Sequence, residues 1–396
     1  MNFFVFMKYI YTILFMILFT SCSNYIVSSD NEKFGKLHSK ANLVIKGEKK
    51  FLLDDYTAPR IPYIQMIKDS LGRDILTFLN SYNNSIYFFD YHRTIFQKKI
   101  QFEKEGPNGI LSIAGYYIIN NDSIFLYNRP MVELVLASSA NVVKQRISLK
   151  GVGEEWPLHY PQYSFNTLCP ILKKDNNLIL TGLCPFSLES SKMNNFHFST
   201  YLNLFDNTLE YYHTYPIELY GNNANWEDPL FMQVYPAISP EGNIIHSFPV
   251  SHNIYISKFK SAEKNPIYAG SNIAGAISSI DWNFIEQRTP RNLIYSHYLK
   301  QDLYGGILYD KWRKVYYRFM EKGLNDATTR SQLNEKQVSI VCMDENFAYI
   351  GEKELGKTKE WNWTNSFVTE EGLNIEYVDM NDVDEKFLIF KIIVFE

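Results

Sequence analysis

The chain has 396 residues, 46% of them hydrophobic and 21% charged, a balance typical of globular proteins and not of disordered or collagen-like ones. Its 39 basic and 43 acidic residues give a formal charge of −4, which argues against a nucleic-acid partner because such proteins concentrate positive charge. The 29 tyrosines and 28 phenylalanines favour strands, so the composition indicates an all-β protein without indicating an activity.

The first elements along the chain are an apolar run and a cysteine. Residues 9–19 are apolar and follow Lys8, and their length suits the core of a signal peptide better than a membrane-spanning helix, which needs about 20 apolar residues. Two small residues then precede Cys22, which resembles a bacterial lipobox with Cys22 as the lipidated residue, although Phe19 stands where that pattern prefers an aliphatic side chain. A plain secretory signal and a retained N-terminal anchor helix remain alternatives.

This beginning divides the chain into three parts. We expect a lipoprotein signal peptide at residues 1–21, a flexible tether at 22–42 that is rich in Ser, Asn and Lys, and a single domain at 43–396. The lipobox resemblance implies a lipid-anchored protein of the bacterial cell envelope, which contacts the membrane through its N-terminal lipid. The residues after Cys22 lack the acidic cluster associated with surface export, so we expect the outer membrane, facing the periplasm.

Beyond residue 42, short apolar runs alternate with Asn, Asp, Gly and Pro, which is the pattern of strands, and no long stretch has a helical period. The runs form five groups of four and one group of three, at 63–102, 112–149, 167–215, 231–270, 305–355 and 364–395. The strand at 43–46, followed by 51–54, would complete the last group and close a ring without open edges. We therefore predict an all-β, six-bladed β-propeller closed by pairing of the N- and C-terminal strands. Seven blades or a pair of β-sandwiches remain alternatives.

Three short motifs add a family resemblance. The segment 239–245, Ser-Pro-Glu-Gly-Asn-Ile-Ile, resembles the turn between the first two strands of TolB-like propeller blades, and 369–375 is a degenerate second copy. The segment 104–109, Lys-Glu-Gly-Pro-Asn-Gly, resembles an inter-blade connection of propeller lipoproteins. Over nearly the whole mature chain, the sequence thus resembles the TolB-like six-bladed β-propeller lipoproteins of Bacteroidota.

The predicted propeller has one face with long loops. Connections from the second to the third strand of a blade, and from one blade to the next, emerge on the same face. All the long connections are of these two kinds, at 150–166, 184–198, 216–230, 271–304, 321–336 and 356–363. Long loops in compact domains are usually functional or disordered, so we expect the working surface on this long-loop face.

The candidate ligand-binding residues of this face combine aromatic rings with carboxylates, guanidinium groups and an imidazole. They are Trp156, His159, Trp226, Glu227, Asp228, Trp282, Arg288, Trp361 and Trp363. Rings beside charged groups suit a polar ligand such as a glycan or a peptide, through stacking and paired hydrogen bonds. The alternative is that the tryptophans fill gaps between blades and contact no ligand.

Patterns for catalysis and metal binding are weak. The eight histidines lack metal-ligand spacing, and neither a nucleophile elbow nor a phosphate loop is found, so we predict no metal and no cofactor. The pairs Glu154–Glu155 and Glu227–Asp228 keep open an alternative, a periplasmic carbohydrate-active hydrolase or lyase. Our leading prediction is a non-enzymatic binding or scaffolding module for an envelope protein or glycan, and a purely structural envelope component is a third possibility.

Three cysteines lie in the predicted domain. Cys169 and Cys184 flank a hairpin signal centred on Asn176–Asn177, and a two-residue turn there would place them opposite each other. Export permits a disulfide between them, but a hydrogen-bonded strand pair holds the two Cα atoms further apart, which favours free buried thiols. Cys342 is expected to be a core thiol.

Overall fold

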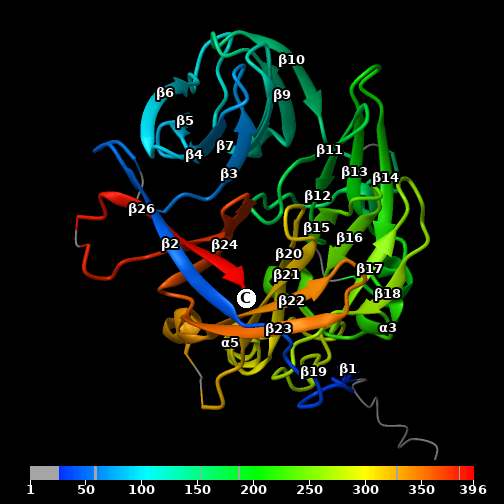
Figure 1. Ribbon diagram of the computed structural model, residues 1–396. Coiled ribbons are helices and arrows are strands. Elements are labelled where there is room, and N and C mark those ends of the chain that lie inside the picture. The colour runs from blue at the N-terminus through cyan, green and yellow to red at the C-terminus, as the bar shows by residue number, and fades with distance from the viewer. Residues whose placement is uncertain (1–25, 58–59, 152, 186–187, 327–328, 383) are drawn as a thin grey trace, which may run out of the picture.

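The structure is a computed structural model that describes residues 26–57, 60–151, 153–185, 188–326, 329–382 and 384–396. Six four-stranded antiparallel sheets account for most of the strands and are arranged as the blades of a ring (Figure 1). The all-β, six-bladed propeller expected from the sequence is confirmed, and the seven-bladed and β-sandwich alternatives are wrong. The predicted signal peptide and Cys22 lie outside the described residues.

The blades follow one another along the chain, and their strands correspond to the predicted groups. Blades 1 to 3 contain β3 (Ile64–Lys68), β4 (Asp74–Asn80), β5 (Ser85–Asp90), β6 (Ile95–Gln101), β7 (Ile113–Asn120), β8 (Ser123–Asn128), β9 (Glu133–Ala137), β10 (Val143–Ser148), β11 (Leu172–Lys174), β12 (Asn177–Thr181), β13 (His197–Asn203) and β14 (Leu209–Thr214). Blades 4 and 5 contain β15 (Tyr235–Ile238), β16 (Ile244–Ser247), β17 (Asn253–Ser257), β18 (Asn265–Tyr268), β20 (Leu303–Asp310), β21 (Val315–Lys322), β22 (Gln337–Asp344) and β23 (Tyr349–Lys357).

Blade 6 closes the ring with strands from both ends of the chain. It contains β24 (Trp361–Thr369), β25 (Gly372–Tyr377), β26 (Phe387–Phe395) and β2 (Leu43–Leu52), in the order β2-β26-β25-β24. The pairing of β2 with β26 runs from Leu43 opposite Phe395 to Leu52 opposite Phe387. One continuous strand of ten residues, with a bulge near Gly47, therefore replaces the two short pieces expected from the sequence.

The apolar side chains of β2 also join blade 6 to blade 1. Phe51 is fully buried, and its ring lies edge-on to Phe89 of β5, with centroids 5.6 Å apart, and to Phe390 of β26 at 6.0 Å. Because aromatic pairs prefer this edge-to-face geometry and exclude water between the sheets, the contact fixes the closing strand against the first blade. Ring closure therefore rests on packing as well as on strand pairing.

One of the motifs behind the family resemblance forms a tight turn. Between β15 and β16, the amide of Ser239 donates to the carbonyl of Asn243 over 2.9 Å, and its hydroxyl donates to the carboxylate of Glu241 over 2.7 Å. Gly242 has a φ of 80°, a conformation that glycine adopts at little steric cost. The turn is short because this residue permits the reversal, and it lies on the face opposite the long loops.

The helical elements of the described residues lie in connections between strands, and all but η1 lie in long connections. They are the 3₁₀ turns η1 (Arg129–Met131), η2 (Trp156–His159) and η3 (Arg330–Glu335), and the helices α2 (Ser190–Met193), α3 (Ile217–Tyr220), α4 (Pro229–Met232) and α5 (Arg291–Lys300). The ten-residue α5 was not predicted from the sequence, because only Ile294 and Leu299 of this helix are buried and two positions do not make an apolar stripe. Among the described residues, no helix is long and apolar enough to cross a membrane.

The segment before β2 corrects another expectation. Residues 26–42 were expected to be part of a flexible tether, but β1 (Ser28–Ser29) pairs with β19 (Ile277–Ser278) of the connection between blades 4 and 5, and Val27 is buried. The sequence suggested a tether because the segment is polar, but hydrogen bonds from Asn31 and from several backbone groups attach it to the propeller.

Blades 4 and 5 are joined by a buried guanidinium. Arg318 of β21 is fully buried and donates to the carbonyls of Ser251 and Ala269, over 2.8 and 3.1 Å, and to the hydroxyl of Ser247 over 3.0 Å. The ring of Tyr304 lies 4.0 Å from the guanidinium carbon. One side chain thus satisfies backbone groups from two connections of blade 4, where the strands themselves are short.

Candidate functional site

A cavity opens among the long loops of blades 3, 4 and 5. This loop-face pocket has a volume of about 630 Å³, within the range of cavities that hold small ligands or parts of peptides. Its apolar lining includes Met193, Tyr220, Trp226, Met232, Phe284 and Ile294. Its charged lining consists of Glu227, Asp228, Arg288 and Arg291. Four of the residues predicted as ligand-binding, Trp226, Glu227, Asp228 and Arg288, are therefore brought together.

The two carboxylates of the pocket are held by backbone groups. Glu227 accepts a hydrogen bond from the amide of Thr289 over 3.0 Å, and the Nε of Arg288 lies 3.9 Å from its other oxygen. Asp228 precedes α4 and accepts from the amide of Leu230 over 3.0 Å. Burial raises the pKa of Asp228 above its usual value, and the nearby Arg291 opposes that shift. The pocket therefore carries charges of both signs, and its two carboxylates are held in place by backbone amides.

Neighbouring side chains fix the wall that α5 contributes. The side-chain amide of Asn225 donates to the carbonyl of Trp282 and to the hydroxyl of Thr289, both over 3.0 Å. The amide of Ile280 donates to the carbonyl of Asn225 over 3.0 Å. Since these bonds join the connection between blades 3 and 4 to the connection between blades 4 and 5, the walls of the pocket are held together in the absence of ligand.

Trp226 forms part of the floor of the pocket. Its side chain is only 3% exposed, and its indole nitrogen donates to the carbonyl of Leu219 over 2.8 Å. The ring lies 5.6 Å from that of Phe231. With its polar group satisfied internally and its faces packed, Trp226 supplies apolar surface and no free ring face for a sugar to stack on.

Trp361 packs within blade 6, and Trp363 packs between blades 5 and 6. Trp361 is 6% exposed, and its ring lies 5.2 Å from that of Tyr377. Trp363 is 7% exposed, stacks on Phe319 at 5.6 Å and donates its indole hydrogen to Glu321 over 2.8 Å. Neither ring lines the loop-face pocket, but Trp363 lines a smaller cavity of about 210 Å³ together with Tyr304 and Glu321. Contact of these two rings with a ligand therefore stays a prediction.

The remaining predicted residues lie outside the lining of the loop-face pocket. Trp156 of η2 is 42% exposed and meets Tyr160 edge-on, while His159 stacks on Tyr211 of the outer strand of blade 3, with centroids 4.7 Å apart. Trp282 is partly buried and donates to the carbonyl of Gln287 over 2.8 Å. The first two belong to the connection between blades 2 and 3, so the nine predicted residues do not form one site.

In the described part of the chain, Cys169, Cys184 and Cys342 are buried thiols that form no disulfide. The hairpin that was expected to bring Cys169 and Cys184 together turns at Asp175–Asn176, one position earlier than predicted, because Lys174 pairs with Asn177 and Asp175 has a φ of 52°. This change shifts the pairing by two residues, so that the two cysteines are not opposite each other. Cys169 instead directs its thiol to the carbonyl of Val234, 3.4 Å away.

The pocket contains no arrangement for metal binding. Across the part of the chain that the structure describes, no group of three or more His, Cys, Asp or Glu side chains is placed to hold a metal ion. The two lining carboxylates are adjacent in the chain, and Glu154 and Glu155 are not among the lining residues. The pocket is therefore suited to binding, through apolar contact and paired charges.

Sequence reasoning missed the residues that give the pocket its apolar character. Met193, Met232, Phe284 and Ile294 come from three different connections, and none belongs to a periodic pattern. Arg291 lies in the same connection as Arg288. The charged lining residues could therefore be predicted, because they cluster along the sequence. The apolar half depends on how the connections fold over one another, which a local pattern does not encode.

Comparisons with known proteins agree with this architecture. A family model described as "Domain of unknown function (DUF4221)" matches residues 40–354. A crystal structure of a DUF4221 member from Bacteroides vulgatus is similar with a TM-score of 0.77 and 18% sequence identity, over 90% of this chain and 99% of that chain.

A second structure, of a candidate exported protein from Bacteroides fragilis, is similar with a TM-score of 0.54 and 13% identity, over 89% of this chain and 95% of that chain. Comparison with curated proteins finds no match. At these identities the structural likenesses show the fold, whereas the family model covers most of the sequence. The chain therefore belongs to the DUF4221 family, a family of six-bladed β-propellers.

Proposed function

We propose that the protein is a non-enzymatic binding module of the bacterial envelope, anchored by a lipid on Cys22, that captures a protein partner through the loop-face pocket. The observation that carries the proposal is the pocket itself. An apolar floor from three connections lies beside two arginines and two carboxylates on a rigid ring. Apolar area supplies affinity in such a site, and a few fixed charges set the orientation of the ligand.

The lining favours a peptide segment over a glycan. Sugars stack on exposed aromatic faces. Trp226 is buried, and its indole nitrogen donates to the backbone carbonyl of Leu219. Met193 and Met232 are unbranched and adapt to the shapes of apolar side chains. An apolar side chain of the partner would enter the pocket, with polar backbone groups reaching Arg288 and Arg291 at its edge.

The alternative of a carbohydrate-active hydrolase or lyase has no specific support in this site. Such chemistry needs two carboxyl groups on opposite sides of the scissile bond. Glu227 and Asp228 follow each other in the chain and are engaged by backbone amides of Thr289 and Leu230. The pocket therefore favours a binding function over a hydrolase or lyase activity.

Selection of displayed random peptides on the purified protein tests the proposal. Arg288→Glu should weaken binding of the selected peptides by about 10- to 100-fold, the loss expected for one charge-assisted contact replaced by repulsion. The Arg288 side chain is 80% exposed, so the melting temperature should not change. Arg330→Glu, an exposed arginine in η3 outside the pocket lining, is the matched control.

The same protein on a glycan array separates the two ligand classes. Enrichment of peptides that bind wild type and Arg330→Glu equally but not Arg288→Glu would support the proposal. Binding to glycans alone, or peptides that ignore Arg288→Glu, would overturn it. The anchor is tested separately, because a fatty-acid probe should label the wild type and leave Cys22→Ser unlabelled.

A further inference from the structure

The inference concerns residues 27–37, which we call the N-terminal clamp because they are bonded to the connection between blades 4 and 5. The amide of Val27 donates to the hydroxyl of Ser279 over 3.0 Å, and the amide of Ser279 donates to the carbonyl of Val27 over 2.9 Å. The pairing of β1 with β19 continues this contact. At the other end, the amide of Leu37 donates to the side chain of Asn272 over 2.8 Å. The clamp is thus attached along its length.

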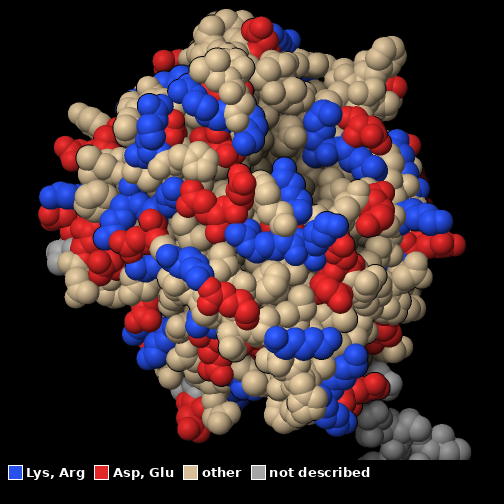
Figure 2. Space-filling model, in the orientation of Figure 1, with Lys and Arg blue, Asp and Glu red and all other residues tan. Residues whose placement is uncertain are grey.

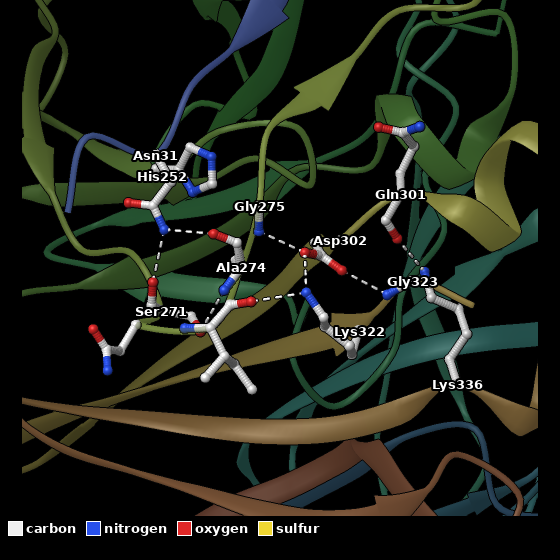
Figure 3. A network of polar contacts seen from close by, with 12 residues as sticks. Asn31, His252, Ser271, Ala274, Gly275, Gln301, Asp302, Lys322, Gly323 and Lys336 are labelled. Atoms are coloured by element: carbon white, nitrogen blue, oxygen red, sulfur yellow. Dashed lines mark hydrogen bonds and ion pairs between the residues drawn. The ribbon is translucent and has the colours of Figure 1, made fainter. Parts of the chain in front are cut away.

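Asn31 is the central contact of the clamp (Figure 3). Its side-chain amide donates to the carbonyls of Ser271 and Ala274, over 2.8 and 2.7 Å, and its oxygen accepts from the hydroxyl of Tyr268 over 2.7 Å. Nearby, the Nε2 of His252 lies 3.1 Å from the carbonyl oxygen of Ser29. The side chain of Asn31 thus makes three hydrogen bonds with three different residues. Together they fix the position of the clamp and the direction in which its chain runs.

The surface that receives the clamp is itself fixed to blade 5. One carboxylate oxygen of Asp302 accepts from the amide of Gly275 over 2.6 Å and from Lys322 over 2.7 Å, and the other accepts from the amide of Gly323 over 2.6 Å (Figure 3). Lys322 also donates to the carbonyl of Ile273 over 2.8 Å. The clamp therefore docks on a part of the connection that is bonded to strand β21.

The clamp enters the protein on the face that carries the loop-face pocket. Val27 packs in the same apolar cluster as the pocket residues Trp226 and Ile294. β1 pairs with β19, which belongs to the connection between blades 4 and 5 and therefore to the long-loop face, and both strands lie at the lower end of Figure 1. The first described residues of the chain thus lie at the long-loop face.

The remaining distance to the predicted lipid is short. Only four residue steps separate Cys22 from Ile26, and a fully extended chain spans at most about 3.3–3.6 Å per residue, so the reach is about 14 Å at most. A free tether over 22–42 would reach about 70 Å by the same measure. The two faces of the ring are separated by the length of a strand, which is roughly 26 Å for the eight residues of β20. The turns on the opposite face therefore lie beyond the reach of the four residues.

We propose that the N-terminal clamp holds the propeller with its long-loop face, and the loop-face pocket in it, turned toward the bilayer that carries the lipid of Cys22. The protein partner captured by the pocket is then one that lies at the membrane surface. The inference rests on the lipid anchor stated under the proposed function and adds the orientation, which a flexible tether would leave free. The sides of the ring and the opposite face then look away from the membrane.

Energy transfer to a lipid dye tests the orientation. The full chain, lipidated in a bacterial host, is reconstituted into phosphatidylcholine vesicles that contain an acceptor-labelled lipid. A donor is attached at Ile285→Cys, in the connection between blades 4 and 5, or at Phe205→Cys, in the β13–β14 turn of the opposite face. Both positions are exposed, at 47% and 90%, and the three thiols of the propeller are buried.

The donor at residue 285 should transfer at least about twice as efficiently as the donor at 205, because roughly 26 Å of strand separates the two faces. Asn31→Ala should reduce this ratio toward one without a large loss of melting temperature, whereas Asn346→Ala, an exposed asparagine of the opposite face, should leave it unchanged. Equal transfer from both donors with Cys22 lipidated would overturn the orientation and leave the anchor standing. A ratio that survives Asn31→Ala would overturn the role of the clamp, and absence of fatty acid on Cys22 would overturn the anchor and the orientation together.

Discussion

Ring closure by β2 makes a prediction that can be measured on a single side chain. Phe51→Ala removes a fully buried ring that joins blade 6 to blade 1 through Phe89 and Phe390. Truncation of a buried phenylalanine costs about 3–5 kcal/mol, and each edge-to-face pair adds about 0.5–1.5 kcal/mol to the contact. We therefore expect the free energy of unfolding to fall by about 4 kcal/mol.

The thermal consequence follows from the size of the domain. An unfolding entropy of about 2.1 cal/mol/K per residue over roughly 370 residues gives about 0.8 kcal/mol/K, so the melting temperature should fall by about 5 °C. Leu52→Ala is the matched control on the same strand, because Leu52 is 59% exposed and its truncation should cost within about 0.5 kcal/mol. Circular dichroism melts and urea midpoints measure both variants.

The comparison of the two variants decides the matter. If Phe51→Ala melts within about 1 °C of Leu52→Ala, β2 contributes no more to the ring than an exposed edge strand does. The assignment of β2 to the core of blade 6 would then be refuted, since its pairing with β26 alone does not bury Phe51 against blade 1. Loss of stability confined to Phe51→Ala would show that the ring is closed by packing between the first and last blades.

Two further predictions concern buried titratable groups. Burial, aided by the positive charge of Lys264, lowers the pKa of His213 to about 3 in the folded protein, so the unfolded chain binds the extra proton below its pKa of 6.5 and stability falls as the pH drops through that value. Between pH 7 and 5, protonation of the unfolded chain at His213 lowers the free energy of unfolding by about 2 kcal/mol. The urea midpoint of His213→Asn should therefore fall less over this pH range than that of the wild type, whereas His38→Gln, at an exposed position, should fall as much as the wild type. Burial also raises the pKa of Cys169 to about 12, so a thiol reagent at pH 8 should find none of the three propeller thiols in folded Cys22→Ser and all three after unfolding. Reaction of the folded protein would contradict the burial of these cysteines.

The surface charge follows from composition more than from fold. On the face drawn in Figure 2, lysines and arginines are interspersed with aspartates and glutamates. The near balance of 39 basic and 43 acidic residues already indicated a mixed surface. Exposed ion pairs of this kind, such as Lys68 with Asp74, contribute little to stability because water and salt screen them.

The sequence by itself determined the architecture of this protein. Short apolar runs bounded by turn residues specify strands locally, so their grouping by four gave the number of blades, and the leftover strands at the two ends gave the closure. The face with the long loops followed from the same count, as did the charged residues Glu227, Asp228 and Arg288, because they cluster in long connections. These features depend on neighbours in the chain, which a local pattern records.

Only the tertiary structure decided which side chains contact one another across connections. Trp226, Trp361 and Trp363 all lie in or beside long connections, yet only Trp226 lines the loop-face pocket, while the other two pack against blades 5 and 6, because the position of an aromatic ring depends on the neighbouring sheet. Residues 27–37 are polar but form a docked clamp. Their composition does not predict this, because hydrogen-bond partners such as Ser271 for Asn31 lie 240 positions away in the chain. Long-range contacts satisfy these groups, and the chain acquires such contacts only when the ring forms.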